Sequence, residues 1–410
     1  MDGRGRLSIG GVDLVDLAEE HGTPLFVYDE AHLRSRCREA VAAFGDGVAY
    51  ASKAFLCAAM ARLAHQEGMA LDVASEGEVH VALAAGVPAS RLVLHGNNKS
   101  VAELRRARTE GVGCTVVDSS DEIRRLEVLH GEDGRRPRVM VRVTPGVEVH
   151  THQFVMTGQE DSKFGFSVAS GAAARAVEHL GASPAVELVG VHAHIGSQVF
   201  ALSSFDRAVG VLAGFFGPLG LGELCVGGGL GVAYVTGEEA PTISAWATGI
   251  RAACRAAGVP DGARVTAEPG RAIVAAAAVT LYRVGTVKVL PGIRTYVAVD
   301  GGMSDNPRPV LYGSGYEAFL PRATSAERPL ASRVVGKHCE SGDVIVRDAW
   351  LPADLAVGDV LATPVTGAYG HSMASTYNKV PRPPVLFVAG GRAQVVVRRE
   401  TLDDLLALDR

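Results

Sequence analysis

The segment VAYASKAFLCAAMARLAHQEGMALDVAS, residues 48–75, contains one complete strand–helix–strand unit and sets the pattern for most of the chain. It begins with the apolar run VAYASK and closes with ALDVAS, and both runs end in small or polar residues. Apolar runs of this length are typical of strands buried on both faces, as in parallel sheets. Such strands alternating with helices predict an α/β fold.

Six further apolar runs continue this pattern. The first four runs end at residues 53, 75, 97 and 119, so they recur every 22 residues, and helix-like segments such as 76–86 and 100–111 lie between them. Eight such units close a parallel (β/α)₈ barrel, which we predict over the main rival, an open doubly wound sheet. The six further runs are RLVLHGN (91–97), CTVVDS (114–119), VMVRVTP (139–145), LVGVHAHIG (188–196), ELCVGGG (223–229) and RVTAEPG (264–270).

The character of the sequence changes after residue 271. Runs such as TYVAVDG (295–301) and VLFVAGGRAQVVVRRE (385–400) combine strand composition with Gly-Gly breaks, which is typical of antiparallel hairpins. We therefore predict two domains. Residues 25–272 would form the barrel, and residues 1–24 and 273–410 would form a mostly antiparallel β-domain.

Composition excludes several classes of partner. The chain has 410 residues and a net charge of −5, from 40 basic and 45 acidic residues, so charge gives no reason to expect nucleic acid or an anionic membrane. Its most apolar stretch, 272–282, has 11 residues and is too short to span a bilayer. The six cysteines form no C-x-x-C pair, which predicts reduced thiols in a cytoplasmic protein without a zinc site.

Chemically active residues stand at the ends of the predicted strands, where a barrel collects its catalytic groups. Lys53 ends the first run, and its amine could serve a structural ion pair or form a Schiff base with a carbonyl cofactor. His192 and His194 point the same way along one strand, but no cysteine or carboxylate stands beside them in the sequence, so we expect no metal. The glycines 227–229 could bind an anion through backbone N–H groups or serve only a tight turn.

The eighth run supplies a carboxylate, Glu268, followed closely by Arg271. Together with Lys53 and the glycine-rich turn, these residues form the set that pyridoxal 5′-phosphate (PLP) needs: an amine, a phosphate-binding loop and a charge partner for the ring nitrogen. A carboxylate beside the pyridine nitrogen keeps that nitrogen protonated, because an opposite charge favours the cationic form. The strand ends therefore indicate a PLP site.

Seven ordered motifs resemble the barrel-type (fold type III) PLP-dependent decarboxylases. Within that family the chain is most similar to the diaminopimelate decarboxylases, especially those of actinobacteria, from about residue 23 to residue 407. The motifs are YASKAF (50–55), HIGSQ (194–198), GGGLG (227–231), EPGR (268–271), DGGMSDNPRPVLYG (300–313), CESGD (339–343) and GAYGHSMASTYN (367–378).

The resemblance implies roles for the residues around the cofactor. Lys53 would bind PLP covalently as a Schiff base, His194 would stack on its ring, and Glu268 would face the pyridine nitrogen. The residues implied to hold the phosphate are Ser197, Gly229, Gly270, Arg271 and Tyr369.

It also implies how the substrate is bound. Cys339 would donate the proton that replaces the lost CO₂, and Glu340 would pair with the distal ammonium of the substrate. Both would reach into the site of a partner subunit, so a homodimer with shared sites is implied. The residues implied to bind the substrate's distal carboxylate are Arg271, Arg308 and Tyr312, and Tyr369 would also contact the substrate.

Arg308 discriminates between substrates, because it would repel the cationic end of ornithine, arginine or lysine. It suits the zwitterionic end of a small molecule such as meso-2,6-diaminopimelate, which places a carboxylate there. The expected activity is therefore decarboxylation of meso-2,6-diaminopimelate to L-lysine, the last step of lysine biosynthesis.

Three alternatives stay open at this point. One is a paralogue of a specialised pathway that acts on a related or carrier-tethered amino acid, which the Cys225-Val226 pair before the glycine triplet would permit. The others are an alanine-racemase-like enzyme and a non-catalytic PLP-binding barrel. Lys163, in the family-like segment EDSKFGFS (160–167), has no assigned role.

Overall fold

The structure, a computed structural model, describes residues 5–147 and 161–410 of the chain. These residues form two compact units, each described here by itself. The barrel unit comprises residues 36–232 and 239–272, and the β unit comprises residues 1–35, 233–238 and 273–410.

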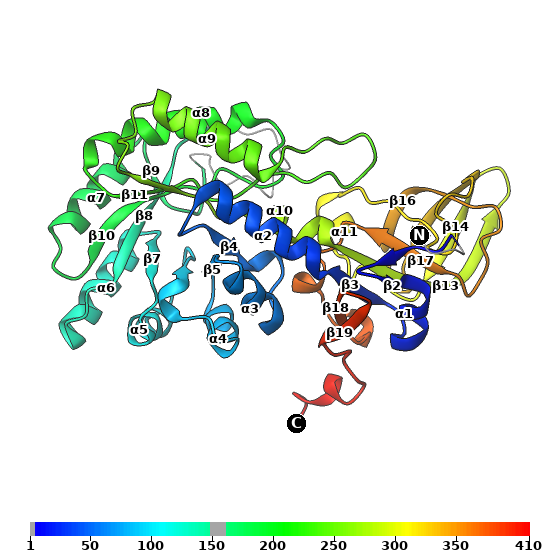
Figure 1. Cartoon of the computed structure of the whole chain (residues 1–410). Helices are drawn as coiled ribbons and strands as arrows, with labels where there is room; N and C mark the ends of the chain where they lie inside the picture. The colour runs from blue at the N-terminus through cyan, green and yellow to red at the C-terminus, as the bar shows by residue number, and fades with distance from the viewer. Residues whose placement is uncertain (1–4, 148–160) are drawn as a thin grey trace. The chain divides into compact units, whose positions relative to one another are not determined.

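Eight parallel strands form the sheet of the barrel unit (Figure 1). Hydrogen bonds from Ala49 N–H to Ala267 O (3.0 Å) and from Ala51 N–H to Pro269 O (3.2 Å) join the two edges, so the sheet closes. In sheet order the strands are β12 (Arg264–Thr266), β11 (Glu223–Cys225), β10 (Glu187–His192), β8 (Arg138–Thr144), β7 (Cys114–Val117), β6 (Leu92–Leu94), β5 (Ala70–Val73) and β4 (Ala49–Ala51), and the short β9 (Phe166–Ser167) pairs with β8.

Serines begin three of the helices that follow these strands. Ser75, Ser100 and Ser119 each accept a hydrogen bond from the backbone N–H three residues later, which satisfies an otherwise unpaired donor in the first turn. The local sequence thus fixes where each strand stops and its helix starts. The helices of this unit are α3 (Ala58–Gln66), α4 (Glu76–Ala84), α5 (Val101–Glu110), α6 (Ser120–Asp133), α7 (Ala172–Ala182), α8 (Leu202–Phe216) and α9 (Ile243–Ala256), and α2 (Glu30–Phe44) begins in the β unit.

A second, mostly antiparallel sheet forms the β unit, with β17 (Val360–Pro364) paired to β13. Only the β14–β15 and β3–β18 pairs of this sheet are parallel. In order its strands are β16 (Val344–Leu351), β15 (Leu330–Val335), β14 (Arg294–Val299), β13 (Ala278–Leu290), β3 (Leu25–Asp29), β18 (Val385–Ala389) and β19 (Arg392–Val397). The hairpin β1 (Ser8–Ile9) and β2 (Val12–Asp13) and the helices α1 (Leu14–His21), α10 (Arg271–Val274) and α11 (Arg308–Tyr312) complete the elements.

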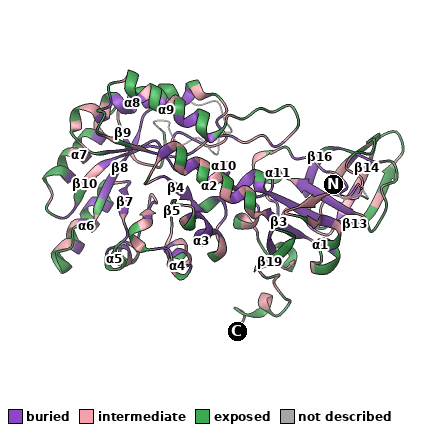
Figure 2. Cartoon of the chain, in the orientation of Figure 1, coloured by how far each residue is buried: buried purple, intermediate pink, exposed green. Residues whose placement is uncertain are grey.

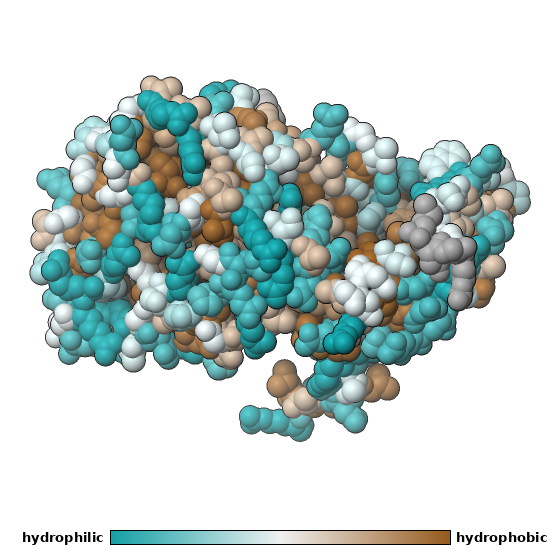
Figure 3. Space-filling view, in the orientation of Figure 1, coloured by the Kyte–Doolittle hydropathy of each residue, from teal (hydrophilic) through white to brown (hydrophobic). Residues whose placement is uncertain are grey.

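Each unit has its own apolar core. In the β unit, α1 packs Leu14 and Leu17 against Leu25, Leu281 and Leu386 of the sheet. Figure 2 shows the strands mostly buried and the outer helix faces exposed, and Figure 3 shows hydrophilic residues spread over those faces.

The predicted fold class is confirmed: all eight expected barrel strands exist, the sheet closes, and a mostly antiparallel sheet follows. The open doubly wound alternative is excluded by that closure. The strand β3 pairs with β13 and β18 and so belongs to the second sheet, although its residues directly precede α2.

Candidate active site

Lys53 lies at the carboxyl end of β4, in a short 3₁₀ helix formed by Ser52–Ala54. Both neighbours are fully buried while Lys53 is exposed. The Ser52 hydroxyl donates to Asp72 O (2.6 Å) and the Tyr50 hydroxyl donates to Phe55 O (2.6 Å), so the turn is held from both sides. The turn thus presents one amine at the barrel mouth on a rigid support.

His194 follows β10 and is oriented by the glycine-rich turn after β11. The Gly228 N–H donates to His194 Nδ1 (3.1 Å), so the neutral ring carries its proton on Nε2. Burial lowers the pKa of His194 well below its usual value, and the ring is therefore neutral. This hydrogen bond fixes the orientation of the imidazole.

Glycine is required in the turns that surround this histidine. Gly229 has a φ of +108°, and a side chain there would collide with the carbonyl oxygen of Gly196. At Gly270 an added Cβ would lie 2.9 Å from both Cβ and O of Ala51. Backbone therefore packs directly on backbone, as in turns that bind phosphate through N–H groups. Beside them Arg271 Nη2 donates to Ser197 Oγ (2.7 Å).

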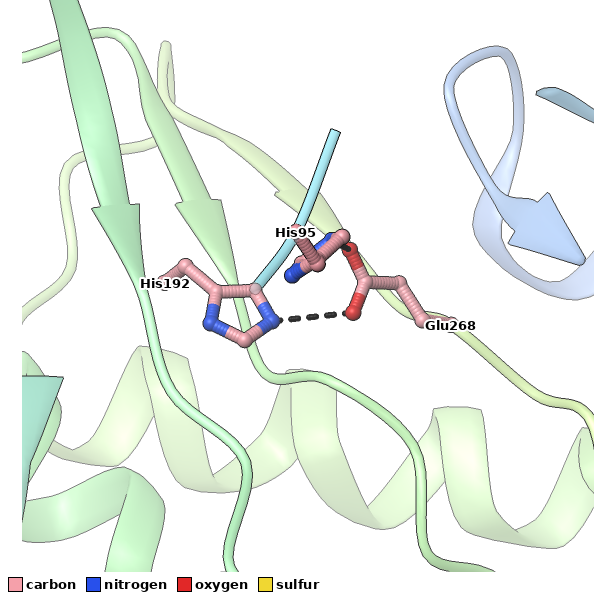
Figure 4. A group of neighbouring side chains, drawn as sticks. All are labelled: His95, His192 and Glu268. Atoms are coloured by element: carbon pink, nitrogen blue, oxygen red, sulfur yellow. Dashed lines mark hydrogen bonds and ion pairs between the residues drawn. The ribbon is translucent and has the colours of Figure 1, made fainter. Parts of the chain in front are cut away.

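Glu268, which follows β12, is buried and hydrogen-bonded at both of its oxygens (Figure 4). Oε1 lies 2.9 Å from His95 Nε2, and Oε2 lies 2.9 Å from His192 Nε2. Burial alone would raise the pKa of Glu268, but the charge of His95 and the hydrogen bonds from both histidines lower it more, to well below its usual value. Glu268 is therefore an ionised carboxylate inside the barrel.

His95 was not among the predicted site residues, and His192 was predicted at the strand end without a function. His95 stands at the end of the run RLVLHGN, so its position at a strand end was the available signal. The donor atoms of His95, His192 and Glu268 lie within 4.8 Å of one another, a set that could ligate a metal. The two hydrogen bonds to Glu268 account for the same geometry without one.

These barrel residues fit PLP. The unit offers a lysine amine, a turn in which backbone packs on backbone, a hydroxyl paired with an arginine, and a buried ionised carboxylate at successive strand ends. Lys53, His194, Ser197, Gly229, Glu268, Gly270 and Arg271 all belong to this unit. The remaining predicted site residues belong to the β unit.

Arg308 begins α11 and has 4% of its surface exposed. Its Nη1 donates to the Tyr316 hydroxyl (2.6 Å), and its guanidinium carbon lies 4.2 Å from the centre of the Tyr234 ring. Within the described ranges, no carboxylate lies within ion-pair distance of Arg308, and its Nε has no hydrogen-bond partner. A buried cation without an anion is costly, so this arginine is suited to an anionic ligand.

Two tyrosines were predicted in the β unit. Tyr312 ends α11 and is half-buried, four residues after Arg308 on the same short helix. Tyr369 has a φ of +59°, a left-handed conformation that costs a bulky residue about 1–3 kcal/mol and that clusters at ligand sites.

Cys339 and Glu340 are both exposed on the loop after β15. Asp343 holds this loop, because its Oδ2 accepts from His338 N–H (2.9 Å) and its Oδ1 from Met303 N–H (2.7 Å). The Cys339 N–H donates to Asn378 Oδ1 (3.3 Å). No sequence pattern indicated that Asn378, 39 positions from Cys339, would anchor this loop.

Lys163, to which no role was assigned, is exposed, and its Nζ lies 5.0 Å from the centre of the Phe164 ring. The aromatic face attracts the ammonium group. The guanidinium carbon of Arg142 lies 4.3 Å from the same ring centre. This packing gives Lys163 a structural contact.

Comparison with known proteins first defines the class. Residues 30–275 match the family described as pyridoxal-dependent decarboxylase, pyridoxal binding domain. This match covers every barrel residue named above, from Lys53 to Arg271, so the barrel is the PLP-binding domain of such a decarboxylase.

Whole-chain relatives narrow the class. The chain is 49% identical to a diaminopimelate decarboxylase of Mycobacterium tuberculosis, covering 99% of this chain and 95% of that protein. It is 45% identical to the diaminopimelate decarboxylase of Bacillus subtilis, with 99% and 95% covered. The crystal structure of diaminopimelate decarboxylase from M. jannaschii superposes with a TM-score of 0.93 at 32% identity, covering 99% and 96%. The chain belongs to the diaminopimelate decarboxylase family.

Proposed function

We propose that this protein decarboxylates meso-2,6-diaminopimelate to L-lysine and CO₂, with PLP as its cofactor. The relatives named above carry this activity in their names, and those from M. jannaschii and Helicobacter pylori were solved in complex with L-lysine. The single observation in this chain that carries the proposal is Arg308, a buried cation with no carboxylate partner in the described residues.

The barrel residues would hold the cofactor. When bound, PLP supplies an electron sink for the bond that breaks at the substrate α-carbon. Lys53 would hold the cofactor through its amine, and the ionised Glu268 would accept a hydrogen bond from the ring nitrogen. His194, oriented by its hydrogen bond from Gly228, would pack on the cofactor ring. The residues assigned to the phosphate are Ser197, Gly229, Gly270, Arg271 and Tyr369.

The β unit would bind the distal end of the substrate. Arg308 binds the distal carboxylate, because its charge is buried and its Nε is available. Tyr312 donates to the same carboxylate, and Glu340 pairs with the distal ammonium. Arg271 is assigned to both phosphate and substrate. A substrate with a cationic tail would meet like charge at Arg308, which disfavours ornithine and arginine.

The direct test is turnover of the PLP-loaded protein with meso-2,6-diaminopimelate, with ¹⁴CO₂ release and L-lysine formation measured together. We expect equal amounts of both products and no measurable turnover of ornithine or arginine. A protein that turns over neither diaminopimelate nor a diamino monoacid, yet binds PLP, would support the specialised-pathway paralogue and refute the proposal.

Cys339 is proposed to deliver a proton to the α-carbon after CO₂ leaves. General acid catalysis typically contributes 10²–10⁴-fold, so Cys339→Ala should lower kcat about 10²-fold or more and change KM little. Cys339→Ser keeps a weaker O–H donor, so its kcat should lie between those of the wild type and Cys339→Ala. Steady-state kinetics and the solvent deuterium isotope effect measure this. Unchanged kcat in Cys339→Ala would remove Cys339 from the mechanism.

The proposal includes a homodimer with shared sites and a cytoplasmic location. The structure bears on the last point only in that none of its described helices is long and apolar enough to cross a membrane. The exposed loop that carries Cys339 and Glu340 supports the shared site, because both side chains are accessible to a second subunit.

Mixing two inactive variants tests the shared site. If Lys53 and Cys339 of one site come from different subunits, a Lys53→Ala subunit paired with a Cys339→Ala subunit contains one intact site. Random re-association should then restore about one quarter of wild-type activity. Activity that stays at the sum of the two variants would show that each site lies within one subunit, and size-exclusion chromatography would report whether a dimer forms at all.

A further inference from the structure

Glu268 is held by two histidines, one from each of two other strands (Figure 4). His95 directly follows β6 and His192 ends β10. All three side chains are almost fully buried, and each histidine contacts a different carboxylate oxygen at 2.9 Å. The carboxylate is therefore fixed in position and in rotation.

The proton positions follow from the charge of the carboxylate. An ionised carboxylate only accepts hydrogen bonds, so Nε2 of both His95 and His192 must carry a proton. Burial lowers the pKa of His192 to about 4, so this ring is neutral, with its Nδ1 unprotonated. Burial would also lower the pKa of His95, but Asp72 and Glu268 raise it above its usual value.

Other charged groups surround the trio and enter any pH dependence. Asp72 Oδ1 lies 3.7 Å from His95 Nε2, and burial raises the pKa of this carboxyl. Burial raises the pKa of Cys225 well above its usual value, so the thiol next to Glu268 is neutral. The remaining charged or titratable groups that face the trio are Lys53, Arg142 and His194.

We propose that His95 and His192 are positioning residues that keep Glu268 ionised and oriented toward the ring nitrogen of PLP. A carboxylate has about four lone-pair sites, so two histidine donors leave capacity for a third N–H donor. Without the histidines, Glu268 would be a buried carboxylate that has lost both of its hydrogen bonds, and burial would favour its protonated form. The inference rests on the proposed role of Glu268.

The test measures the protonation state of the PLP ring nitrogen directly. The protein is loaded with PLP labelled with ¹⁵N at the ring nitrogen, and its ¹⁵N chemical shift is followed against pH in wild type, His95→Met and His192→Met. We expect a protonated nitrogen in wild type and a shift toward the unprotonated value in both variants. Each variant should also lose PLP roughly 10- to 100-fold faster on dialysis, because one hydrogen bond to a charged group is removed.

Gln variants are the matched comparison, because a Gln side-chain N–H₂ replaces the Nε2 donor. His95→Gln and His192→Gln should keep the protonated nitrogen, and kcat should fall in the Met variants with KM little changed. If the Met variants do not fold, the Gln variants still decide: an unprotonated nitrogen in both would overturn the proposal. His179→Met, at an exposed pair with Glu127, is the control and should match wild type.

Glu268→Gln separates this inference from the proposed function. If Glu268 does not face the ring nitrogen, Glu268→Gln leaves the ¹⁵N shift unchanged and the proposed function loses that residue. If Glu268→Gln shifts the nitrogen but both Met variants do not, Glu268 keeps its role and the histidines lose theirs. One equivalent of zinc removed by a chelator, with loss of the ¹⁵N signature, would instead identify the trio as a metal site and refute the inference.

Discussion

Lys53→Ala should yield a folded protein that holds no covalent cofactor and has no measurable decarboxylase activity. The buried residues on either side of Lys53 and the two hydrogen bonds of its turn stay intact, so the fold should not change. Only the amine is lost, and this amine is the group assigned as the nucleophile toward the cofactor aldehyde.

Borohydride reduction followed by peptide mass spectrometry measures the covalent bond, and circular dichroism measures the fold. Lys288→Ala, an exposed lysine of β13, is the matched control and should keep both the PLP adduct on Lys53 and full activity. A PLP adduct found elsewhere, with activity retained in Lys53→Ala, would overturn the assignment of the barrel mouth.

Arg308→Met should raise KM for diaminopimelate steeply and lower kcat/KM by about 30-fold or more, because removing one partner of a buried charge pair costs about 2–5 kcal/mol. Arg308→Lys retains the charge but loses the planar fork of donors, so its loss should be smaller. The buried site has the Tyr316 hydroxyl and the Tyr234 ring, and neither replaces the lost cation.

Steady-state kinetics with diaminopimelate measures binding of the distal carboxylate, and steady-state kinetics with lysine measures rejection of a cationic tail. We expect Arg308→Met to lose its discrimination against a cationic tail as well as its affinity for the dicarboxylate. The exposed Arg392→Met in β19 is the control and should behave as wild type. Diaminopimelate turnover that Arg308→Met leaves unchanged would place the distal carboxylate elsewhere.

Much of the fold could be predicted because the local sequence of a strand indicates whether that strand is buried. The run that ends at Lys53 is short and mostly apolar, and the serines at 75, 100 and 119 mark helix starts. The strand β3 was harder to place, since its residues adjoin a barrel helix but its partners, β13 and β18, lie more than 240 residues away along the chain. No local sequence pattern indicates such a strand pairing.

The site residues likewise divide into those that the local sequence could identify and those that it could not. Lys53, the glycine turn and Glu268 could be found because each stands at a strand end with an unusual residue type. His95 could not be assigned, because a histidine after a strand acquires a function only when a carboxylate 173 positions later faces it. Asn378 was missed for the same reason, since it accepts from a backbone N–H group 39 positions away in the chain.

The sequence by itself determined the barrel, the family and the residues that carry charge or an amine at the strand ends, because these depend on apolar periodicity and residue type. The tertiary structure decided the state of those residues. It made Glu268 an ionised carboxylate by bringing two histidine donors to it, and it left Arg308 buried without an anion. Both outcomes depend on burial and on neighbours distant in the chain, which set the electrostatic free energy of a charge.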